Sequence, residues 1–219
     1  MTGRGLFLTL EGGDGAGKTT QSALLEEWLV ADGAEVVRTR EPGGTEVGLL
    51  IRDIVLHHPG EIAARAEALL YAADRAHHIE TVVRPALARG DVVIQDRYLD
   101  SSVAYQGAGR ILGREEVREL SLWATGGLLP DLTVLLDLDP RIARARLDAD
   151  DKPFDRLESE QDEFHTRVRA EFLAIAAAEP DRFLVLDAAR PAPELAAVIR
   201  ARVAHLRSRG GAERVGAAD

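Results

Sequence analysis

The stretch EGGDGAGKTT, residues Glu11–Thr20, decides the fold of this chain. It follows the apolar run LFLTL at Leu6–Leu10 and precedes apolar residues at helical spacing within Gln21–Asp32. The residues that fit the pattern G-x-x-x-x-G-K-[ST] are Gly12, Gly17, Lys18 and Thr19. Such glycines let backbone N–H groups converge on an anion, while the next helix points the positive end of its dipole at the same place. The stretch therefore predicts a strand, a phosphate-binding loop and a helix.

A loop of this kind holds a nucleoside triphosphate with its Mg²⁺ ion. We expect contacts with the triphosphate along the whole loop, at Gly12, Gly13, Asp14, Gly15, Ala16, Gly17, Lys18, Thr19 and Thr20. Lys18 is expected to be catalytic, because its charge reduces the repulsion between phosphates. The alternative is an ordinary glycine-rich turn, which the Lys-Thr pair and both flanking segments disfavour.

The composition limits the class of protein. With 219 residues, of which 46% are hydrophobic, the chain is long enough to bury one sizeable core. Its formal net charge of −10 argues against a surface that wraps nucleic acid and favours small-molecule partners. Without cysteine it forms no disulfide and no thiolate metal site. No apolar stretch approaches the ~20 residues of a membrane span, and the first residues do not resemble a signal peptide. We expect a cytoplasmic protein without membrane contact.

Short β-rich segments alternate with amphipathic helical patterns along the chain. Strands are predicted at 6–10, 35–39, 91–95, 132–138 and 182–186. Further helices are predicted at 46–58, 61–89 with a kink or break at Pro85, 114–125, 140–149, 159–178 and 193–207. This alternation is typical of an α/β fold in which helices cover both faces of a five-stranded parallel sheet. We predict one domain over residues 1–207 and a frayed tail over residues 208–219.

The side chains that leave the strands at their carboxyl ends should meet, because ligands of such sheets bind at that edge. Strand 91–95 is followed by Asp96, which could orient Mg²⁺ opposite the Thr19 hydroxyl. Arg97 beside it suggests a second anion, held in line with the γ-phosphate. A capping aspartate next to a surface arginine is the alternative for this pair.

Six phrases, in a fixed order across nearly the whole chain, are more specific than the phosphate-binding loop. They are EGGDGAGKTT, TREPGGT, LLYAADRAHH, DRYLDSSVAYQG, LPDLTVLLDLDP and DRLE. In these phrases and their spacing the sequence resembles the thymidylate kinase family. The resemblance implies a three-layer P-loop kinase fold with sheet order 2-3-1-4-5, usually in a homodimer. It also implies transfer of the γ-phosphoryl group of ATP to dTMP with Mg²⁺, a step of dTTP synthesis.

The resemblance also assigns the residues that bind the acceptor. Those implied for dTMP are Asp14, Arg40, Glu41, Arg52, Tyr71, Arg75, Arg97, Ser102, Tyr105 and Gln106. The arginines at 40, 52 and 97 would gather around its phosphate, and Tyr71, where the family commonly has phenylalanine, would stack on thymine. Arg75, Ser102 and Gln106 would bond the edge of the base. Tyr105 would crowd a ribose hydroxyl, and Asp14 would accept a hydrogen bond from the 3′-hydroxyl.

A short lid is expected at about residues 147–158. Family members with glycine at the place of Gly15 usually put catalytic cations in the segment before DRxE. Here that segment is acidic, so Lys152 and Arg156 are the cations assigned to catalysis. The alternative is a solvated charged hairpin in which Arg156 pairs with Glu158. An arginine at 141, 144 or 146 could stack on adenine, or these residues could form a solvated basic helix face.

Several packing and functional alternatives remain open at this stage. Within helix 46–58 the apolar residues are predicted to face the core, namely Val47, Leu50, Ile51, Ile54 and Val55. Trp28 and Trp123 are expected in the core or in an interface, and the His57-His58 and His77-His78 pairs are not expected to bind a metal. A deoxynucleoside kinase with Glu41 as its base, another nucleoside monophosphate kinase, and a non-catalytic nucleotide switch are the alternative functions. A regulatory GTPase is disfavoured, because the chain has no asparagine for an N-K-x-D motif.

Overall fold

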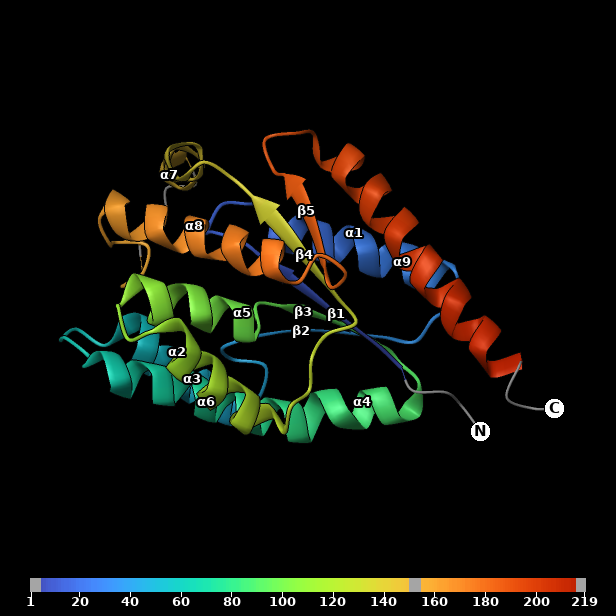
Figure 1. Ribbon diagram of the computed structural model, residues 1–219, viewed down its shortest axis with the longest axis horizontal. Coiled ribbons are helices and arrows are strands. Elements are labelled where there is room, and N and C mark those ends of the chain that lie inside the picture. Colours follow the sequence, from blue (N-terminus) through green and yellow to red (C-terminus); the bar gives the residue numbers. More distant parts are fainter. Residues whose placement is uncertain (1–4, 150–154, 216–219) are drawn as a thin grey trace.

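Five parallel strands form one central sheet (Figure 1). The computed structural model describes residues 5–149 and 155–215. Its strands are β1 (Leu6–Glu11), β2 (Val36–Arg40), β3 (Val92–Asp96), β4 (Leu132–Asp137) and β5 (Phe183–Asp187). Their order, β2-β3-β1-β4-β5, confirms the predicted parallel sheet. Because β1 lies in the middle, between β3 and β4, the loop that follows it reaches the centre of the carboxyl edge.

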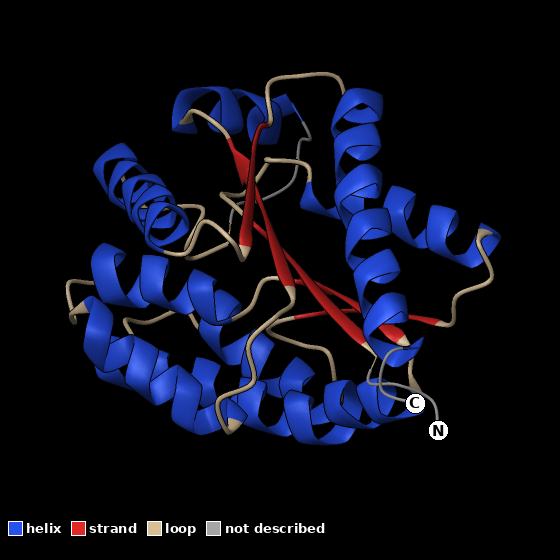
Figure 2. Cartoon of the chain, turned by 45° about the vertical axis from the view of Figure 1, so that its right-hand side comes forward, coloured by secondary structure: helices blue, strands red, loops and turns tan. Residues whose placement is uncertain are grey.

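Helices cover both faces of the twisted sheet (Figure 2). Alternate residues of a strand point to opposite faces, and β1 follows this rule. Leu8 and Leu10 pack into a core with α1 (Lys18–Ala31) and α9 (Ala192–Val215). Phe7 packs on the other face with residues of α4 (Arg84–Arg89). A third cluster joins β4 to α8 (Asp162–Ala178).

The remaining helices lie in two places. One group is α2 (Glu46–His57), α3 (Ala64–His78), α5 (Leu99–Ser102) and α6 (Arg114–Thr125), with π-helical segments η1 (Ile79–Val83) and η2 (Val103–Gly109), whereas α7 (Pro140–Ala149) lies apart from them and packs against α8 (Figure 1). The helical course over residues 99–109 was not predicted, since its serines and glycines are weak helix formers. This irregular segment nevertheless positions Ser102, Tyr105 and Gln106.

The long helical segment does not break at Pro85, so the predicted break is wrong and only the predicted kink stays a prediction. The chain runs from α3 through η1 into α4, and both His78 and Arg84 have right-handed helical backbone angles. Proline lacks an N–H group and its ring crowds the preceding turn. The wider π-helical turn just before it accommodates that ring, so the helical course continues.

The predicted inward face of α2 is wrong for three of its residues. Leu50 is 69% exposed, and Val47 and Ile54 are also exposed. Val55 and Leu56 are buried and Ile51 is partly buried, so the covered face of α2 is displaced from the predicted one. These residues belong to the cluster that contains Tyr71 of α3, the helix against which α2 packs. An apolar stripe therefore remains on the surface.

The last helix also differs from the prediction. α9 continues past Arg207 to Val215, although Gly210 and Gly211 disfavour a helix. Among the helices of residues 5–149 and 155–215, none has the length and apolarity needed to cross a bilayer.

Candidate active site

Positive backbone φ angles shape the loop after β1. Gly12, Gly15 and Gly17 have φ angles of 133°, 74° and 94°, which side chains other than glycine rarely permit. A Cβ on Gly12 would also lie 2.4 Å from the Leu136 carbonyl oxygen. The loop can therefore press its backbone against β4 only with glycine at this position.

Lys18 begins α1, and its ammonium group lies inside the loop. Nζ donates hydrogen bonds to the Gly12 carbonyl at 3.1 Å and the Gly13 carbonyl at 2.8 Å. Burial, together with the positive charge of Arg97, lowers the pKa of Lys18. An anion in the loop would raise this pKa, because it would add negative charge to that of Asp96, Asp14 and Glu11.

The side chains of Thr19 and Asp96 face each other across the ends of α1 and β3. Thr19 Oγ1 lies 3.5 Å from Asp96 Oδ2, and Asp96 Oδ1 is buried without a hydrogen-bond partner. A carboxylate oxygen without a partner and a nearby hydroxyl fit Mg²⁺, which binds proteins through one or two such ligands and keeps its waters. Within the described chain no group of three or more His, Cys, Asp or Glu side chains could hold a metal by itself.

Arg97 connects the phosphate-binding loop with α5. Its backbone has a φ of 66°, which is unusual for arginine, and its N–H bonds to the Leu10 carbonyl at 2.9 Å. Nη1 donates to the Gly12 carbonyl and to Ser101 Oγ, each at 3.1 Å. Nη2 donates to Asp14 Oδ1 at 2.5 Å and to the Tyr105 hydroxyl at 3.3 Å. The guanidinium group is thus fixed by contacts on both sides.

The charge of Asp14 depends on this arginine. Burial alone would raise the pKa of Asp14, but the charges of Arg97 and Lys18 outweigh it and hold that pKa well below its usual range. The Tyr105 hydroxyl adds a hydrogen bond to Asp14 Oδ2 at 3.2 Å. Asp14 therefore stays ionised and can accept a hydrogen bond from a ligand hydroxyl.

A cleft of about 1040 Å³, here called the P-loop cleft, lies over the loop. It is lined by Asp14, Gly15, Gly17, Lys18, Thr19, Arg40, Glu41, Arg52, Asp96, Arg97, Arg146, Leu147 and Glu158. Burial, and then the charge of Arg40, lowers the pKa of Arg52. Cations placed this close repel one another, so the cleft favours a ligand with several negative charges.

A second pocket of about 550 Å³, the Tyr71 pocket, opens beside the cleft. It is lined by Asp14, Glu41, Pro42, Arg52, Leu56, Tyr71, Arg75, Arg97, Tyr98, Ser101, Ser102, Tyr105, Gln106, Asp155 and Leu157. Every residue predicted for the acceptor except Arg40 lines this pocket, and Arg40 lines the cleft. The structure thus brings together residues that are widely separated in the sequence.

Arg75 and Gln106 are held by buried partners within the Tyr71 pocket. Arg75 Nε donates to Glu41 Oε2 at 2.8 Å, and Nη2 donates to Ser102 Oγ at 3.0 Å. Its remaining contacts are with Ser121 Oγ and the Tyr98 carbonyl. Gln106 Nε2 donates to Glu67 Oε1 at 2.9 Å. Both side chains are therefore oriented before any ligand binds, and Arg75 keeps one N–H group for it.

Arg156, one of the two cations assigned to the lid, does not line the cleft. Arg156 pairs with Glu67, and its Nε donates to the Val55 carbonyl at 2.9 Å, so it lies against α2 and α3. Lys152 lies outside the described residues. Arg146 contacts the loop instead, because its Nη1 donates to the Gly15 carbonyl at 3.1 Å and Nη2 to the Ala188 carbonyl at 3.0 Å. The catalytic roles of Lys152 and Arg156 stay predictions.

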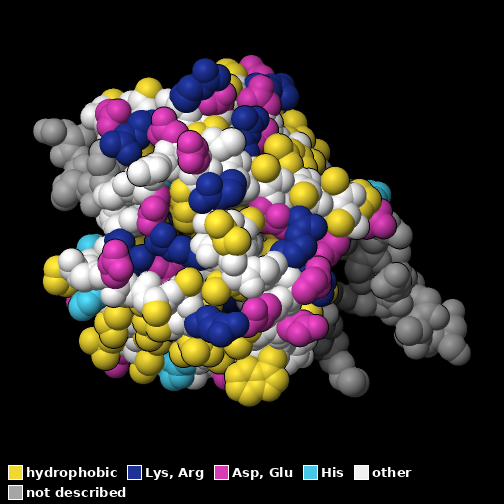
Figure 3. All heavy atoms as spheres, turned by 60° about the vertical axis from the view of Figure 1, so that its left-hand side comes forward, with side chains coloured by type: hydrophobic (Ala, Val, Ile, Leu, Met, Phe, Trp, Pro, Cys, Tyr) yellow, Lys and Arg dark blue, Asp and Glu magenta, His cyan; other side chains and the backbone are white. Residues whose placement is uncertain are grey.

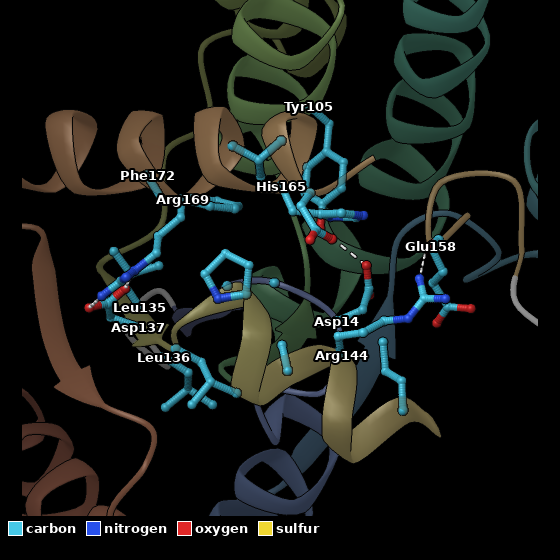
Figure 4. A pocket seen from close by; sticks show the side chains of 18 residues that line it. Asp14, Tyr105, Leu135, Leu136, Asp137, Arg144, Glu158, His165, Arg169 and Phe172 are labelled. Atoms are coloured by element: carbon cyan, nitrogen blue, oxygen red, sulfur yellow. Dashed lines mark hydrogen bonds and ion pairs between the residues drawn. The ribbon is translucent and has the colours of Figure 1, made fainter. Parts of the chain in front are cut away.

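A third cavity, the Phe172 cavity, lies on the other side of Tyr105 (Figure 4). Its floor is the end of β4, and α7 and α8 form its walls. Asp14 and Tyr105 line both this cavity and the Tyr71 pocket, so they separate the two. Arg169 of α8 is anchored there by a bidentate ion pair with Asp137, at 2.7 and 2.9 Å.

The residues predicted to contact the triphosphate occupy different positions around the loop. Asp14, Gly15, Gly17, Lys18 and Thr19 line the P-loop cleft, Gly12 and Gly13 line the Phe172 cavity, Ala16 is buried in the core, and Thr20 is exposed on α1. The backbone of the whole loop still surrounds the place where an anion would bind.

Sequence reasoning missed Glu11, whose side chain holds the turn between β3 and α5. This fully buried carboxylate accepts hydrogen bonds from the Tyr98 N–H at 2.7 Å, the Ser101 N–H at 3.3 Å and Ser101 Oγ at 2.5 Å. Burial and the charge of Asp100 raise the pKa of Glu11 to about 7. The signal was an acidic residue at the end of an apolar strand. Burying a carboxylate there is costly unless hydrogen bonds offset the loss of water, so such a residue points to a role for its side chain.

The fold and the arrangement of the two pockets define a P-loop kinase with a small acceptor, since the Tyr71 pocket meets the phosphate-binding loop at a buried arginine. Comparison with known proteins narrows this class. The profile of the thymidylate kinase family matches residues 10–199. The chain belongs to the thymidylate kinase family.

Individual relatives are similar to this chain over almost their full length. The thymidylate kinase of Clavibacter michiganensis subsp. michiganensis is 70% identical over 206 residues, which are 94% of this chain and 98% of the relative. That of Leifsonia xyli subsp. xyli is 71% identical over 199 residues, 91% and 94% of the two chains. That of Deinococcus radiodurans is 55% identical over 200 residues, 91% and 97% of the two chains.

Proposed function

We propose that this protein transfers the γ-phosphoryl group of ATP to dTMP, which yields ADP and dTDP for the synthesis of DNA precursors. The observation that supports it best is the meeting of the Tyr71 pocket with the P-loop cleft at Arg97. The nucleoside of dTMP would occupy the pocket, and the phosphates of ATP would occupy the cleft. A cytoplasmic location fits this role.

The chemistry requires alignment rather than a base. A phosphate oxygen of dTMP is already ionised at neutral pH, so it can attack the γ-phosphorus directly while the bond to the β-phosphate oxygen breaks and ADP leaves. Lys18 would neutralise charge on the transferred group. Arg97, with its fork fixed by Asp14 and Ser101, would hold the acceptor phosphate in line.

Thr19 and Asp96 would hold Mg²⁺, Thr19 through its hydroxyl and Asp96 directly or through the waters of the ion. When bound, the ion would neutralise charge on the β- and γ-phosphates. The protein contributes the position of both groups, because Thr19 lies in the first turn of α1 and Asp96 ends β3.

The contacts of Glu41 favour a monophosphate over a nucleoside as acceptor. A deoxynucleoside kinase would need this carboxylate as a base for a 5′-hydroxyl. Both of its oxygens are occupied, one by Arg75 at 2.8 Å and the other by His78 at 3.0 Å. A carboxylate held this way orients its neighbours and is poorly placed to take a proton from a ligand.

An assay of ADP release, run with ATP, Mg²⁺ and each common nucleoside monophosphate, tests the proposal. We expect the highest kcat/KM with dTMP and none with thymidine. Phosphorylation of thymidine in place of dTMP would support the deoxynucleoside kinase, and ATP binding without transfer to any acceptor would support a nucleotide switch.

We also propose that the protein forms a homodimer through α2, α3 and α6. These helices carry exposed apolar side chains, among them Leu50 at 69%, Leu69 at 57% and Trp123 at 82% exposure. The three helices contact one another in sequence, and apolar side chains gather on this side of the surface in Figure 3. Patches of this kind mark interfaces in soluble proteins.

Sedimentation of Leu50→Glu tests the dimer. Charge on this stripe should convert a dimer to a monomer, because a carboxylate is costly to bury without a partner. The matched control is Val30→Glu on α1, which also replaces an exposed apolar residue. A monomeric wild-type protein, or a dimer unaffected by Leu50→Glu, would contradict the proposal.

A further inference from the structure

A continuous row of hydrogen bonds leads from β2, through the buried His78 and Glu41, to the Tyr71 pocket. Thr39 Oγ1 lies 2.7 Å from His78 Nε2, and His78 Nδ1 lies 3.0 Å from Glu41 Oε1. Glu41 Oε2 in turn accepts the hydrogen bond of Arg75 Nε. His78, Glu41 and Arg75 are each at most 3% exposed. The row therefore ends at the arginine assigned to the base, and His78 itself does not line the pocket.

The partners determine the tautomer of the imidazole. Glu41 pairs with Arg75 and is acceptor-only when ionised, so Nδ1 must carry a proton. In the neutral ring Nε2 then has a free lone pair, and the Thr39 hydroxyl can donate to it. Each member of the row has a partner for the group it offers. The carboxylate of Glu41 is consequently fixed from one side by the imidazole and from the other by the guanidinium.

The TREPGGT loop is built around this imidazole. A Cβ on Gly44 would lie 2.5 Å from His78 Nε2, so the loop backbone packs directly on the ring. The same loop is held from beneath by Asp74, whose Oδ1 accepts the Gly43 N–H at 3.1 Å. Substitution at His78 should therefore act on Glu41 and the loop before it affects the rest of the fold.

We propose that His78 is a positioning residue for acceptor selection: through Glu41 it orients the Arg75 guanidinium toward the edge of the base. This inference rests on the proposed function. It predicts that loss of the Nδ1 contact weakens discrimination between bases, because a guanidinium only donates hydrogen bonds. Thymine offers a carbonyl at ring position 4, whereas cytosine offers an amino group there. A displaced Arg75 would lose its preference for the carbonyl.

Two substitutions separate the ends of the imidazole. The amide nitrogen of asparagine is bonded to Cγ, as Nδ1 is, so His78→Asn can still donate to Glu41. The amide nitrogen of glutamine is one atom further from the backbone, like Nε2. His78→Gln can therefore still bond to Thr39 but no longer donates a hydrogen bond to Glu41. Both variants lose the ring and much of its packing. A difference in substrate preference between the two variants therefore measures the effect of the contact with Glu41.

The measurement is the ratio of kcat/KM for dTMP to kcat/KM for dCMP, because the fraction of folded enzyme cancels from it. We expect His78→Gln to lower this ratio about tenfold, as for a lost hydrogen bond to a charged group. His78→Asn should stay close to wild type, and KM for ATP should not change in either variant. The matched controls are His77→Asn and His77→Gln, since the neighbouring His77 is exposed on α3.

Equal ratios in His78→Asn and His78→Gln would overturn the inference, whether both fall or neither does. If both variants fail to fold, 15N NMR of the His78 ring in the wild-type protein decides, because the inference requires a proton on Nδ1 for Glu41. A protonated Nδ1 then supports the inference, and an unprotonated Nδ1 overturns it. A wild-type protein that does not phosphorylate dTMP would instead refute the proposed function.

Discussion

Arg97 Nη2 lies 2.5 Å from Asp14 Oδ1, so the arginine that follows β3 is bonded to a residue of the phosphate-binding loop. The same guanidinium bonds to Ser101 of α5 through Nη1. Arg97 is therefore fixed between the phosphate-binding loop and α5, and in the proposed function this is the place between the two substrates. Charged groups contribute most to phosphoryl transfer when they are held in position before the substrates bind.

Replacement of Arg97 by lysine tests whether the fork itself is needed. A lysine keeps the charge but cannot reach Gly12, Asp14 and Ser101 together. We expect kcat with dTMP to fall by roughly 10²-fold, with KM for ATP almost unchanged. Steady-state kinetics with each substrate varied checks this, and Arg114→Lys on the surface of α6 is the control. Unchanged kcat and KM would make Arg97 structural.

Lys18→Met should abolish transfer without unfolding the protein. Methionine retains the apolar part of the lysine side chain. Because burial lowers the pKa of Lys18, its positive charge does not stabilise the folded protein in the absence of a ligand. We expect kcat to fall by about 10²-fold to 10³-fold or more, while the midpoint of thermal unfolding stays the same or rises. A folded variant with near-normal turnover would refute the assignment of the phosphate-binding loop.

The sheet and the loop could be predicted because each depends on a local pattern. The run before Gly12 alternates between two cores as a strand requires, and the loop glycines occupy the φ angles that favour glycine. The face of α2 could not be predicted in this way. Leu50 is exposed in this chain, although its place in the sequence pattern does not differ from that of a core residue.

The site could be predicted where it follows strand ends and motifs, and not where it depends on side-chain partners. The motifs identify the residues of the Tyr71 pocket, but no periodicity places Arg156 against Glu67 or Arg146 against Gly15. Long side chains have several reachable partners, and the buried Glu67 carboxylate competes for any nearby guanidinium. Such choices are decided by three-dimensional packing.

Glu11 should make stability depend on pH. Its folded pKa, raised to about 7 from 4.5, means that the folded state binds the proton more tightly than the unfolded state. The stabilising contribution is therefore complete below pH 4.5 and is lost as the pH rises through 7. This loss is absent in Glu11→Gln. The free energy of unfolding of the variant should therefore rise by about 3 kcal/mol relative to that of the wild type between pH 4.5 and about pH 8.

Urea unfolding of both proteins across this pH range measures the difference, and subtraction removes the contribution of Asp74, whose pKa burial and Glu41 raise to about 6. The groups that act on Glu11 include Asp100, Arg97, Ser101 and the N–H of Tyr98. A difference in unfolding free energy that does not change with pH would mean that Glu11 titrates as an ordinary carboxylate.

The cation that completes the transition state can be identified by comparing Arg146 with Arg156. Arg146 contacts the Gly15 carbonyl and lines the P-loop cleft, whereas Arg156 is paired with the buried Glu67. We expect Arg146→Ala to lower kcat and kcat/KM by similar factors of about 10²-fold, which is the behaviour of an interaction made in the transition state.

Arg156→Ala should act differently if its partner in the working enzyme is Glu67. The buried carboxylate would lose one of its arginines, which costs about 1–3 kcal/mol of stability, and KM for dTMP should rise because Glu67 also holds Gln106. Thermal unfolding and kinetics with dTMP and ATP varied separately measure both effects. If Arg156→Ala and Lys152→Ala instead lower kcat as much as Arg146→Ala, with stability unchanged, the lid cations leave their positions when substrates bind, as the sequence hypothesis predicts.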